Sequence, residues 1–118
     1  MIKSFSDLEV YKLSYKLAIE IFKLSRSFPT SEKYSLTDQV VRSSRSVSAN
    51  IAEGFGRRTY TSEFKKFLTY SAGSLEETKV WLSFARDCNY ITNEQFESFF
   101  HLTDEIGAKI HKLHIAWK

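Results

Sequence analysis

The sequence predicts an all-α fold, an antiparallel up-down four-helix bundle that forms one domain over residues 1–118. Four glycines and one proline leave too few tight turns for a β-sandwich or a β-barrel. Apolar residues also recur in steps of three and four along most of the chain, which is the period of a helix. With 42% hydrophobic and 26% charged residues, the chain suits one globular core and is too apolar for a disordered protein.

The first helix is expected to begin at Ser6-Asp7-Leu8-Glu9, which matches a capping box. In such a box the Ser6 hydroxyl and the Glu9 carboxylate accept hydrogen bonds from backbone N–H groups of the first turn. Two adjoining apolar stripes follow, and so wide an apolar face implies burial against more than one neighbour. They consist of Leu8, Tyr11, Tyr15, Ala18 and Phe22, and of Val10, Leu13, Leu17, Ile21 and Leu24. Phe28-Pro29 should end this helix, because the residue before a proline is pushed out of the α region.

The second helix is expected to run from Lys33 or Leu36 to Glu53, and the third from Thr61 to Cys88. Gly54 and Gly56 should stop the second helix, as helix-ending glycines do. Small residues occupy the middle of both helices, at Ser44, Ser48 and Ala52 and over Ser71-Ala72-Gly73-Ser74. Such segments allow two backbones to approach closely, although the two could equally face different neighbours. Packing is favoured over a binding site as their cause.

The fourth helix has the most regular pattern in the chain. Thr92-Asn93-Glu94-Gln95 is a second capping-box pattern. After it, apolar residues follow a 3-4 spacing over about three heptads, which is typical of a helix in a bundle. This seam comprises Phe96, Phe99, Thr103, Ile106, Ile110, Leu113 and Trp117.

The single cysteine and the lack of apolar runs indicate where the protein works. Cys88 has no partner for a disulfide within the chain, which favours a reducing compartment. The first residues lack the apolar run of a signal peptide, and nowhere do 18 apolar residues follow one another. We therefore expect a soluble, cytoplasmic protein without membrane contact.

The sequence contains no recognisable catalytic or metal-binding signature. His101 and Glu105 are four residues apart, and His111 and His114 three, so each pair could share a helix face and hold a metal. However, no Glu precedes a His by three positions, as it does in the di-metal four-helix proteins. A nucleophile elbow and a phosphate-binding loop are also missing. We expect no enzyme, metal or cofactor, and keep a metal-dependent enzyme built on these four residues as a distant alternative.

Positive charge is concentrated between Gln39 and Lys66, although the whole chain carries only +3. This stretch contains six basic residues and only two acidic residues, Glu53 and Glu63. If the turn after the second helix brings these cations together, they form one patch that attracts phosphates without reading bases. The alternative is a solvated face with local ion pairs to the two glutamates. The candidate nucleic-acid-binding residues are Arg42, Arg45, Arg57, Arg58, Lys65 and Lys66.

Aromatic residues exceed what the core of one small bundle needs. Because aromatic residues are enriched at protein interfaces, this surplus predicts self-association. Together with the two stripes of the first helix, the surplus comprises Tyr11, Tyr15, Tyr34, Tyr60, Tyr70, Trp81, Phe84 and Tyr90.

Several sequence blocks together carry a family resemblance. They are Asn50-Ile-Ala-Glu-Gly-Phe-Gly-Arg57, Glu63-Phe-Lys-Lys-Phe-Leu68, Gly73-Ser-Leu-Glu-Glu77, Phe5-x-Asp-Leu-Glu-Val10 and Phe28-Pro29. Over nearly its whole length the chain resembles the four-helix-bundle family first noted as proteins encoded within intervening sequences of 23S ribosomal RNA genes. That family includes relatives of the accessory variability protein of diversity-generating retroelements. Those relatives form homopentamers with a basic surface and engage nucleic acid and a reverse transcriptase.

The resemblance implies that Arg42, Arg57 and Arg58 belong to a basic surface. It also implies a structural role at the exit of the second helix for Asn50, Glu53 and Gly54, beside Gly56. Two departures are visible: many relatives have paired arginines where this chain has Val41-Arg42, and a proline where it has Ser48. The first lowers the positive charge of each subunit.

Two functional hypotheses follow from the charge pattern and the resemblance. The leading one is a non-enzymatic, pentameric scaffold that holds RNA or DNA for a partner machine such as a reverse transcriptase or a ribosomal RNA element. The alternative is a protein-interaction module in which the same arginines pair with an acidic partner protein.

Overall fold

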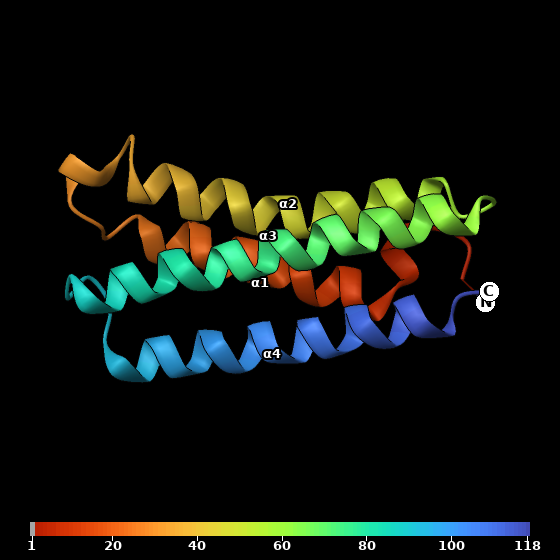
Figure 1. The fold of residues 1–118 in the computed structure, drawn as a ribbon. Helices are drawn as coiled ribbons and strands as arrows, with labels where there is room; N and C mark the ends of the chain where they lie inside the picture. The colour runs from red at the N-terminus through yellow and green to blue at the C-terminus, as the bar shows by residue number, and fades with distance from the viewer. Residues whose placement is uncertain (1) are drawn as a thin grey trace.

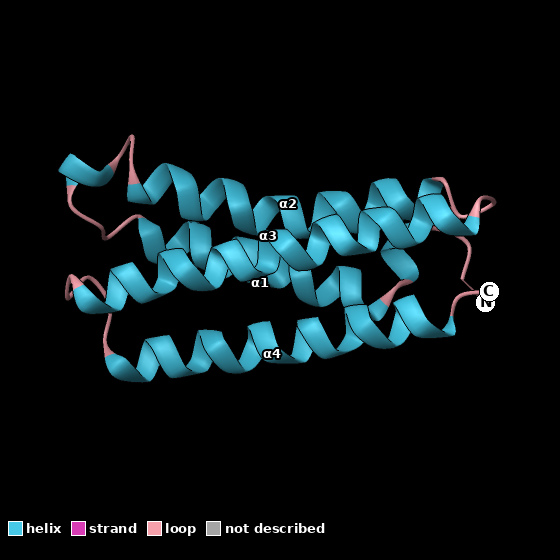
Figure 2. Ribbon diagram, viewed as in Figure 1, coloured by secondary structure: helices cyan, strands magenta, loops and turns pink. Residues whose placement is uncertain are grey.

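The computed structural model describes residues 2–118, which form four long helices, each antiparallel to the next (Figure 1). The helices are α1 (Glu9–Ser25), α2 (Leu36–Gly56), α3 (Thr61–Asp87) and α4 (Asn93–Ala116), with short 3₁₀ turns η1 (Phe5–Asp7) and η2 (Thr30–Glu32) before α1 and α2. The described residues contain no strand (Figure 2). The predicted all-α bundle is thus confirmed. It measures 44 × 25 × 20 Å, and both chain ends lie at the same end of its long axis.

The capping box predicted at Ser6 and Glu9 is wrong, because a 3₁₀ turn precedes the helix. The Ser4 hydroxyl accepts the Ser6 N–H at 3.1 Å, and the Asp7 carboxylate accepts the N–H groups of Lys3 and Ser4 at 2.9 and 3.1 Å. These backbone hydrogen bonds hold the pKa of Asp7 below its usual value. Since Ser6 and Asp7 belong to η1, α1 begins only at Glu9 and has no side-chain cap.

Small residues bring α2 and α3 together, and these two helices make the most extensive contact in the bundle. The Ser71 hydroxyl donates to the Val47 carbonyl oxygen at 2.7 Å, and the Thr78 hydroxyl donates to the Ser43 hydroxyl at 2.9 Å. Such short bonds between a side chain of one helix and the neighbouring helix require closely spaced backbones. The small segments of the two helices therefore face each other, and every buried side-chain polar atom among the described residues has a hydrogen-bond partner.

The two glycines predicted to end α2 lie inside its last turn instead. Neither glycine has a positive φ; the helix ends at Gly56, and the next residue, Arg57, donates its N–H to the Gly54 carbonyl oxygen at 2.9 Å. Gly54 serves close packing: a Cβ added there would lie 2.7 Å from the Phe67 Cβ and 3.1 Å from a ring carbon of Phe64. The absence of a side chain at Gly54 thus lets the start of α3 approach the end of α2.

The ends of α3 and α4 largely follow the sequence pattern. Asn89, with φ of 63°, takes the left-handed conformation after α3, and the Tyr90 N–H then donates to the Ala85 carbonyl oxygen at 2.8 Å. The capping box at Thr92 and Gln95 is confirmed, with bonds of 2.8 and 3.0 Å. The α4 seam faces the core: four of its residues are buried and Phe99, Leu113 and Trp117 are partly buried.

Candidate nucleic-acid interface

The turn between α2 and α3 gathers four of the six predicted cations. Arg57 forms ion pairs with Glu53 and Glu63, at 3.3 and 3.2 Å, and Lys66 pairs with Glu63 at 2.9 Å. Contact with Lys66 and Arg57 lowers the pKa of Glu63, and the same carboxylate raises the pKa of Lys66. About half of the Arg57 side chain remains exposed. Exposed pairs of this kind contribute only about 0–1 kcal/mol, so these cations can exchange a carboxylate for a phosphate.

Arg58 and Lys65 form no ion pair with a described carboxylate. The Arg58 guanidinium lies 4.0 Å over the Phe55 ring and donates to the Phe55 carbonyl oxygen at 2.9 Å. Stacking on an aromatic ring limits the conformations of the guanidinium while its charge stays at the surface. The turn therefore keeps one preorganised positive charge without a counter-ion.

Arg42 and Arg45 do not join this group. They precede Arg57 by 15 and 12 residues on α2, which corresponds to about 22 and 18 Å along the helix axis. Arg45 instead lies 5.6 Å over the ring of Phe22 in α1. The single patch considered from the sequence is thus divided into a cluster at the end of the bundle and two arginines on its side.

Further cations lie at the same end of the bundle, on and just after the last turns of α4, and no local sequence pattern pointed to them. Trp117, just after α4, packs edge-on against Phe64 and lies 6.4 Å from the Phe55 ring. This contact places the last residues of the chain beside the α2–α3 turn, where both chain ends lie in Figure 1. We call this end of the bundle the cationic end; it carries Arg57, Arg58, Lys65, Lys66, Lys112 and Lys118. Lys112 lies on its α1 side, where it lines a groove with Leu8 and Glu9.

The two ends of the bundle differ in charge. The segments that meet at the cationic end, residues 2–12, 53–66 and 109–118, hold nine basic and four acidic residues. The segments at the opposite end, residues 26–38 and 83–97, hold three basic and five acidic residues. Although the net charge is only +3, positive charge is therefore concentrated at one end of the bundle and negative charge at the other.

The family resemblance implies a structural role for four residues at the exit of α2, and these lie where α2 meets α3. They are Asn50, Glu53, Gly54 and Gly56. The Asn50 side-chain amide donates to the carbonyl and hydroxyl oxygens of Ser46, both at 2.9 Å, and Ser46 is also bonded to the Ser74 hydroxyl at 2.9 Å. Glu53 holds Arg57, and Gly54 permits the close approach of α3. A Cβ added at Gly56 would meet no atom within 4 Å, so close packing does not require a glycine there.

The histidines of α4 do not assemble into a metal site. His101 and His111 are exposed and His114 is half-buried. Among residues 2–118, no three His, Cys, Asp or Glu side chains lie close enough to share a metal ion. Within the same range, no helix combines the length and hydrophobicity that a membrane crossing requires.

Comparisons with known proteins agree with this architecture. The family model described as "23S rRNA-intervening sequence protein" matches residues 6–112. The fold is similar to a crystal structure of a protein with unknown function from the S23 ribosomal protein family of Bacteroides thetaiotaomicron VPI-5482. That structure has 27% sequence identity and a TM-score of 0.82, and the match covers 91% of this chain and 96% of the other. A search of curated proteins finds no match. Because the family model spans nearly the whole domain, the chain belongs to the family of 23S rRNA-intervening sequence proteins.

Proposed function

We propose that the protein is a non-enzymatic, ring-forming scaffold, most simply a pentamer, whose cationic end holds RNA or DNA for a partner machine. The observation that carries this proposal is the charge polarity of the bundle, with nine basic against four acidic residues at one end. A cluster of cations binds the phosphate backbone by Coulomb attraction and counterion release, without contacts to bases. Repetition of the cluster around a ring would multiply its contacts with one nucleic-acid strand.

The proposal predicts binding that depends strongly on salt and weakly on sequence. Arg58→Glu with Lys65→Glu removes two cations that form no ion pair within residues 2–118. A charge reversal changes one phosphate contact by on the order of 1 kcal/mol in water, so the double variant should bind at least about tenfold more weakly. The slope of log affinity against log salt should also become shallower, by about 1.4 for the single strand and about 1.8 for duplex DNA. Fluorescence anisotropy with a labelled single-stranded RNA of mixed sequence, repeated with duplex DNA, measures both quantities.

A matched control separates a local site from a general charge effect. Lys16→Glu with Lys23→Glu makes the same change in net charge on exposed positions of α1. The proposal requires this control to bind nearly as the wild type does, and equal weakening by both variants would show that only net charge matters. Arg42→Glu, which also lies away from the cationic end, should have a small effect as well.

The ion pairs of Arg57 with Glu53 and Glu63 favour a second candidate function. They show that carboxylates already fit this surface, so an acidic partner protein could occupy it. Pull-down with and without nuclease distinguishes the two candidates. A partner that survives nuclease and is lost in the Arg58→Glu, Lys65→Glu variant supports the protein-interaction module.

A further inference from the structure

Two exposed tyrosines lie beside the cations of the α2–α3 turn. Tyr60, the residue before α3, is 70% exposed, and Tyr70, on α3 itself, is 49% exposed. Single exposed aromatic residues are common on protein surfaces and need no explanation. These two differ because their neighbours in the chain include Arg57, Arg58 and Lys66, so aromatic rings and cations occur together at this end of the bundle.

One face of α3 carries both a cation and aromatic rings. Lys66, Phe67 and Tyr70 lie on it together, because residues three and four apart share one side of a helix. The rings of Phe67 and Tyr70 meet edge to face with their centroids 5.4 Å apart, and the Lys66 ammonium lies 5.8 Å from the Phe67 centroid. Phe67 therefore supports the Tyr70 ring next to a positive charge, while about half of Tyr70 stays open to solvent.

Two guanidinium groups at the turn are also held flat by aromatic rings. Arg57 lies 4.9 Å over the ring of Phe67, and Arg58 lies 4.0 Å over the ring of Phe55. The opposite face of a guanidinium held in this way can stack on a nucleobase. The backbone of the turn is fixed as well, since the Tyr60 N–H donates to the Arg57 carbonyl oxygen at 2.9 Å. The flat groups of this surface are thus in place before any ligand binds.

We infer that the cationic end binds single-stranded nucleic acid, with Tyr60 and Tyr70 each stacking on a base while the neighbouring cations hold the phosphates. The inference rests on the nucleic-acid binding proposed above and names the form of nucleic acid that is bound. Stacking requires the flat face of a base, which a duplex hides between neighbouring base pairs. A single strand leaves these faces open, so it can use the rings and the cations together, whereas a duplex can use the cations alone.

The separation of the two tyrosines suits a strand that runs along the start of α3. Tyr60 and Tyr70 are ten residues apart, which corresponds to about 15 Å along the helix axis. Neighbouring nucleotides of a stacked strand are about 3.4 Å apart along its axis, so the two rings contact bases several nucleotides apart. Lys66 lies between the two tyrosines on α3 and can hold the phosphates of the intervening nucleotides.

Substitution of both tyrosines tests stacking separately from charge. Tyr60→Ala with Tyr70→Ala keeps every cation, and loss of one base–aromatic stack weakens binding by about 5- to 150-fold. The double alanine variant should therefore bind a labelled, mixed-sequence single strand at least about tenfold more weakly in fluorescence anisotropy. Its slope of log affinity against log salt should stay that of the wild type, because no phosphate contact is lost. Phenylalanine at both positions keeps the rings and should retain wild-type affinity.

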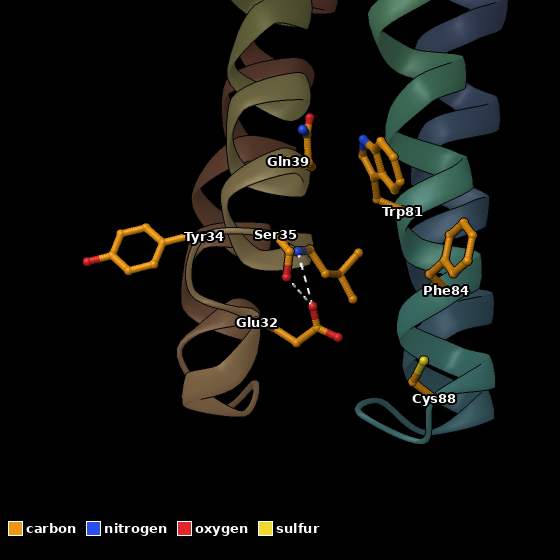
Figure 3. A pocket seen from close by; sticks show the side chains of 8 residues that line it. Glu32, Tyr34, Ser35, Gln39, Trp81, Phe84 and Cys88 are labelled. Atoms are coloured by element: carbon orange, nitrogen blue, oxygen red, sulfur yellow. Dashed lines mark hydrogen bonds between the residues drawn. The ribbon is translucent and has the colours of Figure 1, made fainter.

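Matched controls are available on both the ligand and the protein. An abasic DNA strand of the same length and a DNA duplex offer phosphates without open base faces, so the wild type and the double alanine variant should bind each of them equally. Tyr34 is 85% exposed at the opposite end of the bundle, and its ring points away from Trp81 and Phe84 (Figure 3). Tyr34→Ala removes an equally exposed tyrosine and should bind the single strand as the wild type does.

The contrary outcomes separate stacking from the scaffold itself. Stacking is overturned if the double alanine variant binds the single strand as tightly as the wild type, or if the wild type binds the abasic strand equally well. An equal loss of affinity for the abasic strand also overturns it, because a disturbed fold or assembly then explains the loss. In each of these cases the phosphate-binding scaffold stands. A wild-type protein that binds none of the three ligands overturns both proposals.

Discussion

Replacing Gly54 by alanine is expected to destabilise the bundle, whereas the same change at Gly73 should stabilise it. An alanine Cβ at position 54 would lie 2.7 Å from the Phe67 Cβ and 3.3 Å from the Phe64 carbonyl oxygen. Optimal contacts between carbon atoms are about 3.5–4.0 Å, so α2 and α3 must move apart. Overpacking of this kind costs about 1–3 kcal/mol, and alanine regains about 1 kcal/mol through its higher helix propensity.

Because a Cβ–Cβ distance of 2.7 Å places the overpacking cost in the upper part of that range, the expected net effect is a loss of about 1–2 kcal/mol for Gly54→Ala. Such a loss lowers Tm by roughly 4–8 °C in a chain of this length. At Gly73 a Cβ meets nothing within 4 Å, so Gly73→Ala should gain up to about 1 kcal/mol. Urea unfolding followed by circular dichroism, at equal protein concentrations, measures both changes. The reasoning is refuted if Gly54→Ala is as stable as the wild type, or if the two substitutions change stability equally.

Three further predictions concern hydrogen bonds and packing. Hydrogen bonds from Ser35 and Tyr90 hold the pKa of Glu32 below its usual 4.5, so this carboxylate stabilises the fold above that pH and loses the effect as pH falls. The Tm difference between wild type and Glu32→Gln should accordingly shrink from neutral to acid pH, and a constant difference would contradict this. Ser71→Ala should lose about 0.5–1.5 kcal/mol in urea unfolding, since the bond to Val47 is buried; no change would mean that the bond contributes nothing. Trp117→Ala should lower Tm by several degrees because its ring closes the core, and an unchanged Tm would show a loose terminus.

The helices were predictable from the sequence where local signals sufficed. The α4 capping box and seam depend on residues three or four apart, and both are confirmed. The start of α1 was misplaced because two overlapping Ser-x-x-acid patterns, from Ser4 and from Ser6, compete at this site and the earlier one forms. The end of α2 was misplaced because Gly54 looks the same in sequence whether it ends a helix or admits a neighbouring one.

The candidate surfaces depended on tertiary structure and were only partly predictable. The α2–α3 turn gathers Arg57, Arg58, Lys65 and Lys66, as a short connection allows. Lys112 and Lys118 are about fifty residues away in sequence, and only the return of α4 brings them to the same end. The pocket that Leu36 and Gln39 of α2 form with Trp81 and Phe84 of α3 (Figure 3) joins side chains more than forty residues apart, so no local pattern could reveal it.

The position of the chain ends has a practical consequence for anyone who labels this protein. Because Trp117 packs against Phe64 at the start of α3, a tag or fluorophore fused at either terminus would lie at the same end of the bundle as the α2–α3 turn (Figure 1). A polyhistidine tag would add its own affinity for polyanions there, and a bulky fusion would block access. The exposed residue Asn89, between α3 and α4 at the other end of the molecule, offers a position for a probe that leaves the cationic end untouched.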